Sequence, residues 1–518
     1  MRCISKTVVA IVLVMAFTVP ALAGGKGHHW TPKKFKSEVV NVSNDLTRRF
    51  GMPLIAVNPT NPNNIVIVAV DSGYTLGCQD ANDPDCELIP RVMFTPTGAP
   101  IPLPPAPRGV YATPGFATIG IFVSFDRGKT WTKSDVSGLY PAGHPEIISK
   151  GESPIMFTPD GTLYIGFNAL NWGDWEADPP TFLPSAGIGI IKSIDGGLTW
   201  SDPVLTGTPA DFPYGCSDLS MDDMIYVVSG LGAPSFLGPR STGDPDSPIL
   251  STVGDRWLVF SDDGVNWTEP QRLGGSDENG SYSIRYSDVQ ATHGEVATAF
   301  SWTSVDENAC QYFVDGPAPC VVFQTTTDVG YTWNRHRVPY PFEVPGEPNM
   351  VLLAADPSME GHFAVAVMNT DKARFFVYQT HDSGNTWSGP TTVAAHPTKT
   401  HFFPNMKYSP EGVLGLIWRI NEGDIYPAVE PYSIWTAISL DGGTTFSEPL
   451  EVSKTDSSPP PPGDIWLDWD GHSGDHGPGG IAIDGHARRV YVVWGDWSPG
   501  ERAVFFRAIK FSEFRFNR

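Results

Sequence analysis

The sequence predicts an all-β fold made of a repeated module of four strands, and three observations carry this prediction. A short motif, Ser/Thr-x-Asp-x-Gly-x-Thr-aromatic, occurs six times in the chain. Each copy follows a run rich in β-branched and aromatic residues, and turn-forming glycine (53) and proline (49) are abundant. A motif that recurs every 54 to 69 residues marks a supersecondary module that cannot bury its faces alone. The modules are therefore expected to pack against one another.

Each copy of the motif has the composition of a tight turn between two strands. The Asp carboxylate can accept hydrogen bonds from backbone N–H groups just downstream, and Gly adopts the positive φ that other residues resist. The aromatic residue offers a large face for burial between modules. The third copy is aligned on Asp262 with Phe260 in the Ser/Thr position, and the sixth has Phe446 in place of Trp. The six aspartates are Asp126, Asp195, Asp262, Asp328, Asp382 and Asp441.

The motif resembles the Asp-box, or BNR repeat, and the chain is similar in this to the sialidase-like superfamily of β-propellers. The resemblance covers nearly the whole mature chain and implies four-stranded blades, with the box joining the third and fourth strands. It is more specific for the fold than for an activity, because catalytic and non-catalytic members share the box. A propeller also accommodates the about 495 residues that follow the first 23 as one closed ring.

The first 23 residues have the pattern of a secretory signal peptide. Arg2 and Lys6 precede an apolar run, which ends before the typical cleavage site Ala21-Leu22-Ala23. The alternative, a membrane anchor, needs a longer apolar run. We expect cleavage near Ala23, a secreted (extracellular or periplasmic) protein without a membrane span, a mobile segment over residues 24–36 and one propeller over residues 37–518.

The composition is acidic, with a formal net charge of −23. Such a surface disfavours nucleic acid and anionic membranes as partners. It does not identify the partner, since acidity also promotes solubility. We expect a monomer that binds a carbohydrate or another small polar substrate.

Five cysteines follow the signal segment. Cys78 and Cys86 bracket one acidic loop, and Cys310 and Cys320 bracket another loop. Because both pairs are close in sequence and export permits oxidation, we expect two local disulfides, with zinc as the alternative. Cys216 is left over, either as a buried thiol or as a reactive thiol at the channel mouth.

The blades are expected to follow in chain order. Blade one starts at Arg49 and carries a long Pro- and Gly-rich insertion from Asp71 to about Ala117. The next five start near Glu152, Asp218, Arg285, Asn349 and Phe402. Beyond the sixth motif the chain supplies three more strands, and the N-terminal Ser37–Ser43 can add a fourth, which would remove exposed edges. We therefore expect seven blades, with six blades and a C-terminal appendage as the alternative.

In a propeller the inner strands begin at one mouth of the channel, whereas the boxes lie at the opposite end. Functional residues are therefore expected at the starts of the inner strands. Acidic residues recur there, at Glu152, Asp218, Asp288 and Asp475. A ring of carboxylates could hold a cation such as Ca²⁺, act as acid and base, or simply be solvated.

The resemblance also implies a sialidase site with three carboxylate-binding arginines, a Tyr nucleophile activated by Glu, and an Asp acid/base. Arg48-Arg49-Phe50-Gly51-Met52-Pro53 departs from the Phe/Tyr-Arg-Ile-Pro motif of that family. Arg285 and Arg419 can be the second and third arginines by blade order, and Tyr286 and Tyr432 are candidate phenols. The expected catalytic residues are Arg285, Tyr286, Asp288, Asp475 and Glu152. The expected substrate contacts are Arg49, Asp218, Arg419, Trp172, Trp302 and Trp497.

Two further groups of residues leave alternatives open. His401, His472 and His476 could bind copper or zinc, or be polar residues of the channel mouth. The tryptophans could stack on sugar rings or pack blade against blade. We expect a secreted glycoside hydrolase of sialidase-like type that requires no cofactor. The alternatives are a non-catalytic propeller that binds glycans or proteins, and a metal-dependent enzyme or polysaccharide lyase that uses the histidines.

Overall fold

The computed structural model describes twenty segments of the chain, and the fold is built from them. They are residues 37–45, 50–71, 88–94, 100–107, 119–136, 147–150, 153–171, 187–208, 214–221, 224–230, 256–274, 283–303, 314, 320–341, 350–368, 374–393, 400–421, 432–453, 479–496 and 503–516. Within them the only helix is a short 3-10 turn, Phe511–Glu513, and no helix is long and apolar enough to cross a membrane.

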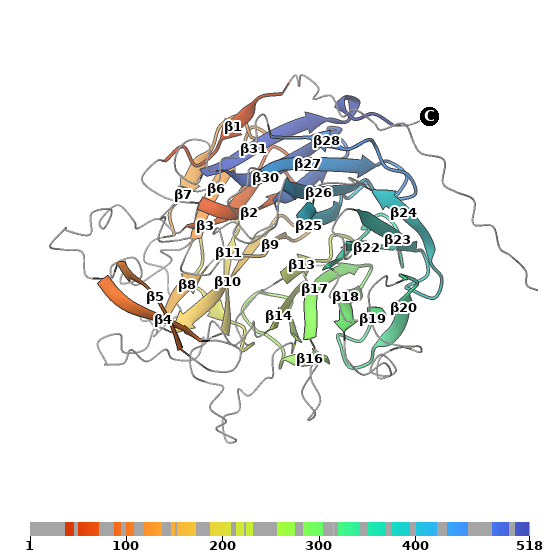
Figure 1. Ribbon diagram of the computed structural model, residues 1–518, viewed down its shortest axis with the longest axis horizontal. Helices are drawn as coiled ribbons and strands as arrows, with labels where there is room; N and C mark the ends of the chain where they lie inside the picture. The colour runs from red at the N-terminus through yellow and green to blue at the C-terminus, as the bar shows by residue number, and fades with distance from the viewer. Residues whose placement is uncertain are drawn as a thin grey trace, which may run out of the picture. The chain divides into compact units, whose positions relative to one another are not determined.

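The strands form seven antiparallel blades, each described here from its inner to its outer strand (Figure 1). Blade 1 holds β2 (Phe50–Val57), β3 (Ile65–Asp71), β6 (Ile119–Ser124) and β7 (Thr132–Ser134). Blade 2 holds β8 (Ile147–Lys150) with β9 (Ile155–Phe157), then β10 (Leu163–Asn171), β11 (Gly187–Ser193) and β12 (Val204–Leu205). Blade 3 holds β13 (Tyr214–Ser217), β14 (Ile225–Gly230), β15 (Arg256–Ser261) and β16 (Gln271–Gly274).

The remaining blades repeat this order. Blade 4 holds β17 (Ser283–Thr292), β18 (Glu295–Thr303), β19 (Cys320–Thr326) and β20 (Asn334–Val338). Blade 5 holds β21 (Met350–Ala355), β22 (Phe363–Met368), β23 (Phe375–Thr380) and β24 (Ser388–Val393). Blade 6 holds β25 (Thr400–Tyr408), β26 (Leu414–Asn421), β27 (Tyr432–Ser439) and β28 (Leu450–Glu451). Blade 7 holds β29 (Gly480–Asp484), β30 (Arg489–Asp496), β31 (Ala503–Lys510) and β1 (Val39–Asn41).

The ring is closed by both ends of the described chain. The inner strands contact their neighbours in the order β2, β9, β13, β17, β21, β25, β29 and back to β2. In blade 7 the outer strand β1 lies beside β31 (Figure 1). Their register places Val40 opposite Phe506. The composite seventh blade is confirmed, and the six-bladed alternative is wrong. The expected insertion in blade 1 contains a separate hairpin of β4 (Leu88–Phe94) and β5 (Pro100–Pro107).

Blade-to-blade packing holds the ring together, and the tryptophans of the boxes take part in it. Trp131 of blade 1 stands edge-on to Phe506 of blade 7, with ring centroids 5.1 Å apart. Trp387 of blade 5 meets Phe323 of blade 4 in the same way at 5.2 Å. Such aromatic pairs add about 0.5–1.5 kcal/mol beyond the area they bury. The expected burial of box tryptophans between modules is confirmed for these two.

The Asp boxes close the turns between third and fourth strands, as the sequence predicts. In the first box Asp126 Oδ1 accepts hydrogen bonds from the backbone N–H groups of Lys129 and Thr130, both at 2.9 Å. The Ser124 hydroxyl donates to Asp126 and accepts from the Gly128 N–H at 2.8 Å. Gly128 has φ +81°, and a Cβ there would lie 2.3 Å from the Phe506 ring. The glycine is therefore required by both the turn and the neighbouring blade.

The third box corrects the sequence alignment. The carboxylate that closes this turn belongs to Asp263, which accepts from the N–H groups of Val265 and Asn266 at 2.7 and 2.8 Å. Ser261 takes the place of the first Ser/Thr, because its hydroxyl donates to Asp263 and accepts from the Gly264 N–H. This box has one residue fewer between its Asp and its Gly than the other boxes. The predictions that Asp262 closes the turn and that this copy has lost its first Ser/Thr hydroxyl are therefore wrong.

Candidate functional site

Every blade has two ends with different chemistry. We call the end where the inner strand begins the mouth end, and the opposite end the turn face. The turns between first and second strands lie on the turn face with the boxes, because the Arg127 N–H of the first box donates to Asn63 of the β2–β3 turn at 3.0 Å. The expected separation of the boxes from the inner-strand starts is therefore confirmed.

The mouth-end half of the inner strand is interrupted in four blades. In β2, β17 and β25 the register with the second strand shifts, between Gly51 and Leu54, Arg285 and Asp288, and Phe402 and Asn405. In blade 2 the inner strand is split, since β8 and β9 pair with successive parts of β10. An irregularity of this kind bends the strand and re-aims side chains, and it is common beside active sites.

Three predicted catalytic residues lie on the interrupted strand β17. Arg285 pairs with Ser301 and Asp288 with Ala299, so Tyr286 lies within the register shift. Trp302 is near the mouth end of the adjacent β18, opposite Ile284. The fold thus brings the backbones of these four predicted residues to one region of blade 4, while their roles stay predictions.

The other predicted residues of the mouth are placed only in part. His401 lies on β25, opposite Ile420. Glu152 falls in sequence between β8 and β9. Outside the described residues lie Arg49, Glu152, Trp172, His472, Asp475, His476, Trp497, Cys78, Cys86 and Cys310. Their predicted roles, including both disulfides, remain predictions, although Cys320 is fully buried at the start of β19.

Arg419 and Tyr432, both singled out from the sequence, are in contact in blade 6. Arg419 is only 5% exposed, and its guanidinium lies 3.6 Å from the centre of the Tyr432 ring. The Tyr432 hydroxyl donates to the backbone oxygen of Gly495 in blade 7 at 2.7 Å. A cation over an aromatic face is stabilised by the ring quadrupole, so the phenol holds the guanidinium in a fixed place near the mouth end.

Two buried aspartates at the mouth end were missed by the sequence analysis. Asp71 is the last residue of β3 and is 1% exposed, and Lys133 Nζ lies 3.2 Å from its Oδ2. Asp496 ends β30 in the neighbouring blade 7 and accepts a hydrogen bond from Trp494 Nε1 at 3.3 Å. Both aspartates end an apolar strand, in the stretches IVIVAVD and VYVVWGD. This sequence pattern was the signal that could have identified them.

Asp218 corrects a second prediction. It was expected at the start of the inner strand of blade 3, but that strand is β13, and Asp218 follows its end. Its carboxylate accepts from the Ser220 N–H at 2.9 Å and from the Gly294 N–H of blade 4 at 2.7 Å. Asp218 therefore joins two turns on the turn face, and its predicted place at the mouth is wrong. Cys216, on the same strand, is a buried thiol.

Asp218 belongs to a second repeat that the sequence analysis did not recognise. Each turn between first and second strands opens with a short polar residue that caps the turn or bonds to the next blade. These residues are Asn58, Thr158, Asp218, Thr292, Asp356, Ser409 and Asp484. Four of the seven are followed by proline, which is the signal in the sequence.

The carboxylates of the Asp boxes each accept several hydrogen bonds. Burial would raise the pKa of Asp126, but bonds from the backbone and side chain of Thr130 and from Ser124 lower it to about 2. The Asn266 and Val265 N–H groups likewise hold the pKa of Asp263 well below its usual range. Such groups stay ionised and engaged, so they are poor candidates for proton transfer. Among the described residues, no cluster of three His, Cys, Asp or Glu side chains could hold a metal ion.

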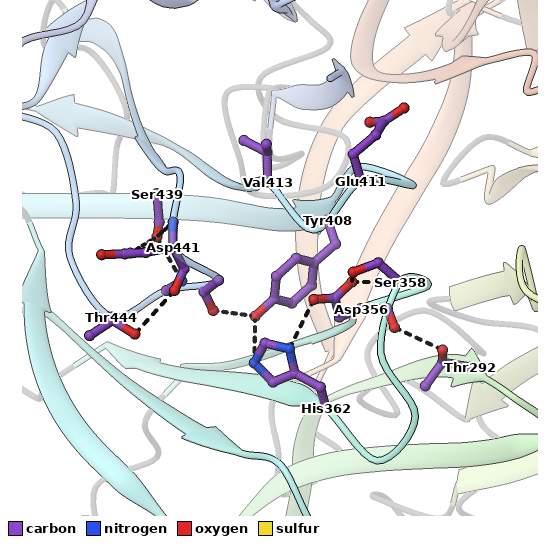
Figure 2. A network of polar contacts seen from close by, with 12 residues as sticks. Thr292, Asp356, Ser358, His362, Tyr408, Glu411, Val413, Ser439, Asp441 and Thr444 are labelled. Atoms are coloured by element: carbon purple, nitrogen blue, oxygen red, sulfur yellow. Dashed lines mark hydrogen bonds and ion pairs between the residues drawn. The ribbon is translucent and has the colours of Figure 1, made fainter. Parts of the chain in front are cut away.

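A polar network links blades 4, 5 and 6 on this face (Figure 2). His362, 2% exposed, lies with its Nδ1 2.9 Å from Asp356 Oδ2, and its Nε2 is 3.4 Å from the Tyr408 hydroxyl. Tyr408 donates to the backbone oxygen of Gly442 at 2.6 Å. Burial would raise the pKa of Asp356, but hydrogen bonds from His362 and from Ser358 lower it.

Comparison with known proteins finds only distant similarities in structure. No family model matches the chain, and no curated protein matches it in sequence. A Hadza microbial sialidase is similar in structure at 17% identity, over 76% of this chain and 72% of its own, with a TM-score of 0.42. A protein of unknown function from Dyadobacter fermentans has 14% identity, 77% and 97% coverage and a TM-score of 0.44. A polysaccharide lyase that acts on ulvan has 12% identity, 77% and 95% coverage and a TM-score of 0.40. The blades and their boxes make the described part of this chain a seven-bladed β-propeller with Asp-box turns.

Proposed function

We propose that the protein is a secreted carbohydrate-active enzyme, a glycoside hydrolase of sialidase-like type that acts at the mouth end. The observation that carries this proposal is the interruption of the inner strand in blades 1, 2, 4 and 6. Arg285, Tyr286 and Asp288 lie in or beside one interruption, and Glu152 falls in sequence within another. An inner strand that served stability alone would not need such an interruption in its pairing with the second strand.

Each predicted residue at the mouth end would have a separate role in the reaction. The Arg285 guanidinium would orient an acidic or hydroxylated substrate, because its planar fork matches a carboxylate bidentately. Arg419 would assist from blade 6. Asp288 or Asp475 would transfer the proton to the leaving group, with the other carboxylates or Tyr286 acting on the anomeric carbon. Trp302 would stack on a sugar ring.

A non-catalytic glycan-binding propeller is the second candidate, and the Arg419–Tyr432 contact favours it. The phenol proton of Tyr432 is already donated to Gly495, and the guanidinium of Arg419 is largely buried. Both groups therefore serve as rigid structure in blade 6. A mouth built from such fixed groups suits recognition as well as catalysis.

Screening of the purified mature protein against aryl-glycosides and acidic polysaccharides separates these candidates. Release of the aryl group supports hydrolysis, whereas an unsaturated uronate product indicates a lyase. Binding without either product supports the second candidate. A parallel series with chelator tests the metal-dependent alternative.

Variants of blade 4 then test the assignment of the site. We expect Asp288→Asn to lower kcat by about 10²–10⁴, the usual contribution of a general acid or base. Arg285→Ala should mainly raise KM for acidic substrates. Lys129→Ala, on the exposed side of the first box, is the matched control and should be unchanged. A detected activity that survives both blade 4 variants would contradict this site.

A further inference from the structure

The polar network on the turn face contains a pair of stacked histidines that the proposed function does not use. The imidazole rings of His362 and His381 have centroids 4.1 Å apart and are inclined by 22°. His362 is buried just before β22, whereas His381 is exposed within the fifth Asp box, between Thr380 and Asp382. Both belong to blade 5, but the groups around them come from three blades.

The contacts of His362 join blade 5 to its two neighbours. On one side Asp356, which holds His362 Nδ1, has its backbone oxygen bonded by the Thr292 hydroxyl of blade 4 at 2.9 Å. On the other side lie Tyr408 and Gly442 of blade 6, and a Cβ at Gly442 would be 3.0 Å from His362 Cε1. The space around this ring is therefore fixed by all three blades.

The hydrogen bonds restrict where His362 can carry protons. Because the carboxylate of Asp356 is an acceptor, Nδ1 must hold a proton. Tyr408 gives its own proton to Gly442 at the much shorter distance of 2.6 Å, so its oxygen faces Nε2 mainly with lone pairs. These contacts hold the His362 ring in place beside His381.

The second ring of the stack resists protonation. Burial first, and then the charge on His362, lower the pKa of His381, although Asp382 and Asp356 act in the opposite direction. His336 of β20 lies beside the same box, and burial lowers its pKa against the opposing effect of Asp382 and Glu295. The groups that face the stack are therefore Asp356, Tyr408 and Asp382, with His336 and Glu295 behind them.

We propose that the His362–His381 stack is an acid-sensitive joint, in which a proton on His381 beside the fixed ring of His362 weakens the contacts that His362 makes with blade 6. A lowered pKa of His381 means that the folded protein binds this proton less readily than the unfolded chain. Stability is therefore present above the ordinary histidine pKa of 6.5 and is lost as the pH falls from there through the folded pKa.

The joint is connected to the mouth end through a single strand. β25 begins at Thr400 near the mouth end and finishes at Tyr408, which touches His362. The register shift between Phe402 and Asn405 lies on the same strand. A change at the joint would therefore alter the position of the part of β25 that contains His401 and pairs with Arg419.

Hydrogen–deuterium exchange of the full mature chain, corrected for the intrinsic effect of pH, tests the joint. Between about pH 7.5 and about pH 5.5, where histidine titrates, we expect exchange of residues 350–368 and 400–421 to rise severalfold, and that of residues 50–71 to stay constant. In His381→Gln, an exposed position that folding tolerates, the rise should disappear. His486→Gln on the turn face of blade 7, paired with Glu411 at 3.2 Å, is the matched control and should keep it.

Three outcomes would overturn the proposal. One is constant exchange of blades 5 and 6 in the wild type over this range. Another is the same rise in His381→Gln as in the wild type. The third is an equal rise in every blade, which would indicate global rather than local loosening. Because His362→Gln removes the imidazole that bonds Asp356, NMR titration of the His381 ring in the wild type is the second measurement. An ordinary histidine titration there would contradict the stack.

Discussion

The turn face and the mouth end of the same blades follow opposite rules. On the turn face each box uses the same few atoms, and its carboxylates are saturated by the next four residues, as Asp126 and Asp195 are. At the mouth end the strands of blades 1, 2, 4 and 6 break their register, and buried charges have partners that differ from blade to blade. The repeat therefore builds the ring, and the mouth end, where the inner strands depart from the repeat, is the region to which the proposed chemistry is assigned.

The largest effect is expected where the turn face meets a neighbouring blade. Gly128→Ala and Gly207→Ala place a Cβ at similar positive φ values, +81° and +78°. Only the first meets another residue, since its Cβ would lie 2.3 Å from Phe506, while nothing lies within 4 Å of the second. We expect Gly207→Ala to cost about 1 kcal/mol for the left-handed conformation. Gly128→Ala should cost a further 1–3 kcal/mol, roughly, for overpacking.

Urea denaturation of the two glycine variants measures this difference. Equal losses of unfolding free energy would mean that the blades yield to the added methyl group, and that the box is not fixed against Phe506. A common m-value in both variants and the wild type is needed as the control, because it shows that only stability has changed.

A smaller effect distinguishes the two adjacent aspartates of the third box. Asp263→Ala removes the acceptor of two backbone N–H groups and of the Asn266 side chain, so we expect a loss of about 1–2 kcal/mol, as for a helix or turn cap. Asp262→Ala, at an exposed position, should change stability by less than about 0.5 kcal/mol. Thermal unfolding checks the pair, and the reverse order would restore the alignment on Asp262.

The fold was predictable because the information that determines it is local. Ser124, Asp126 and Gly128 close their turn with one another, and six such turns mark six of the seven blades. The third box was misaligned because Asp262 and Asp263 both fit the pattern, and only backbone geometry selects between them. Asp218 was misplaced for a related reason, since an acidic residue beside a short strand looks the same at either end of it. Asp71 is buried beside Lys133, which lies 62 positions later in the sequence. No local sequence pattern predicts a contact between residues so far apart.

The smallest effect bears on whether blade 6 supplies chemistry or only structure to the mouth end. Tyr432→Phe removes the hydrogen bond to Gly495 but keeps the ring beneath Arg419. We expect a loss of about 0.5–1.5 kcal/mol, the net contribution of one hydrogen bond, with substrate turnover and binding unchanged. Arg419→Leu is the companion variant, because it removes the charge but keeps an apolar side chain, and it should weaken binding of acidic substrates. If turnover were lost in Tyr432→Phe while the melting temperature barely changed, Tyr432 would be a nucleophile, and blade 6 would supply chemistry as well as structure to the mouth end.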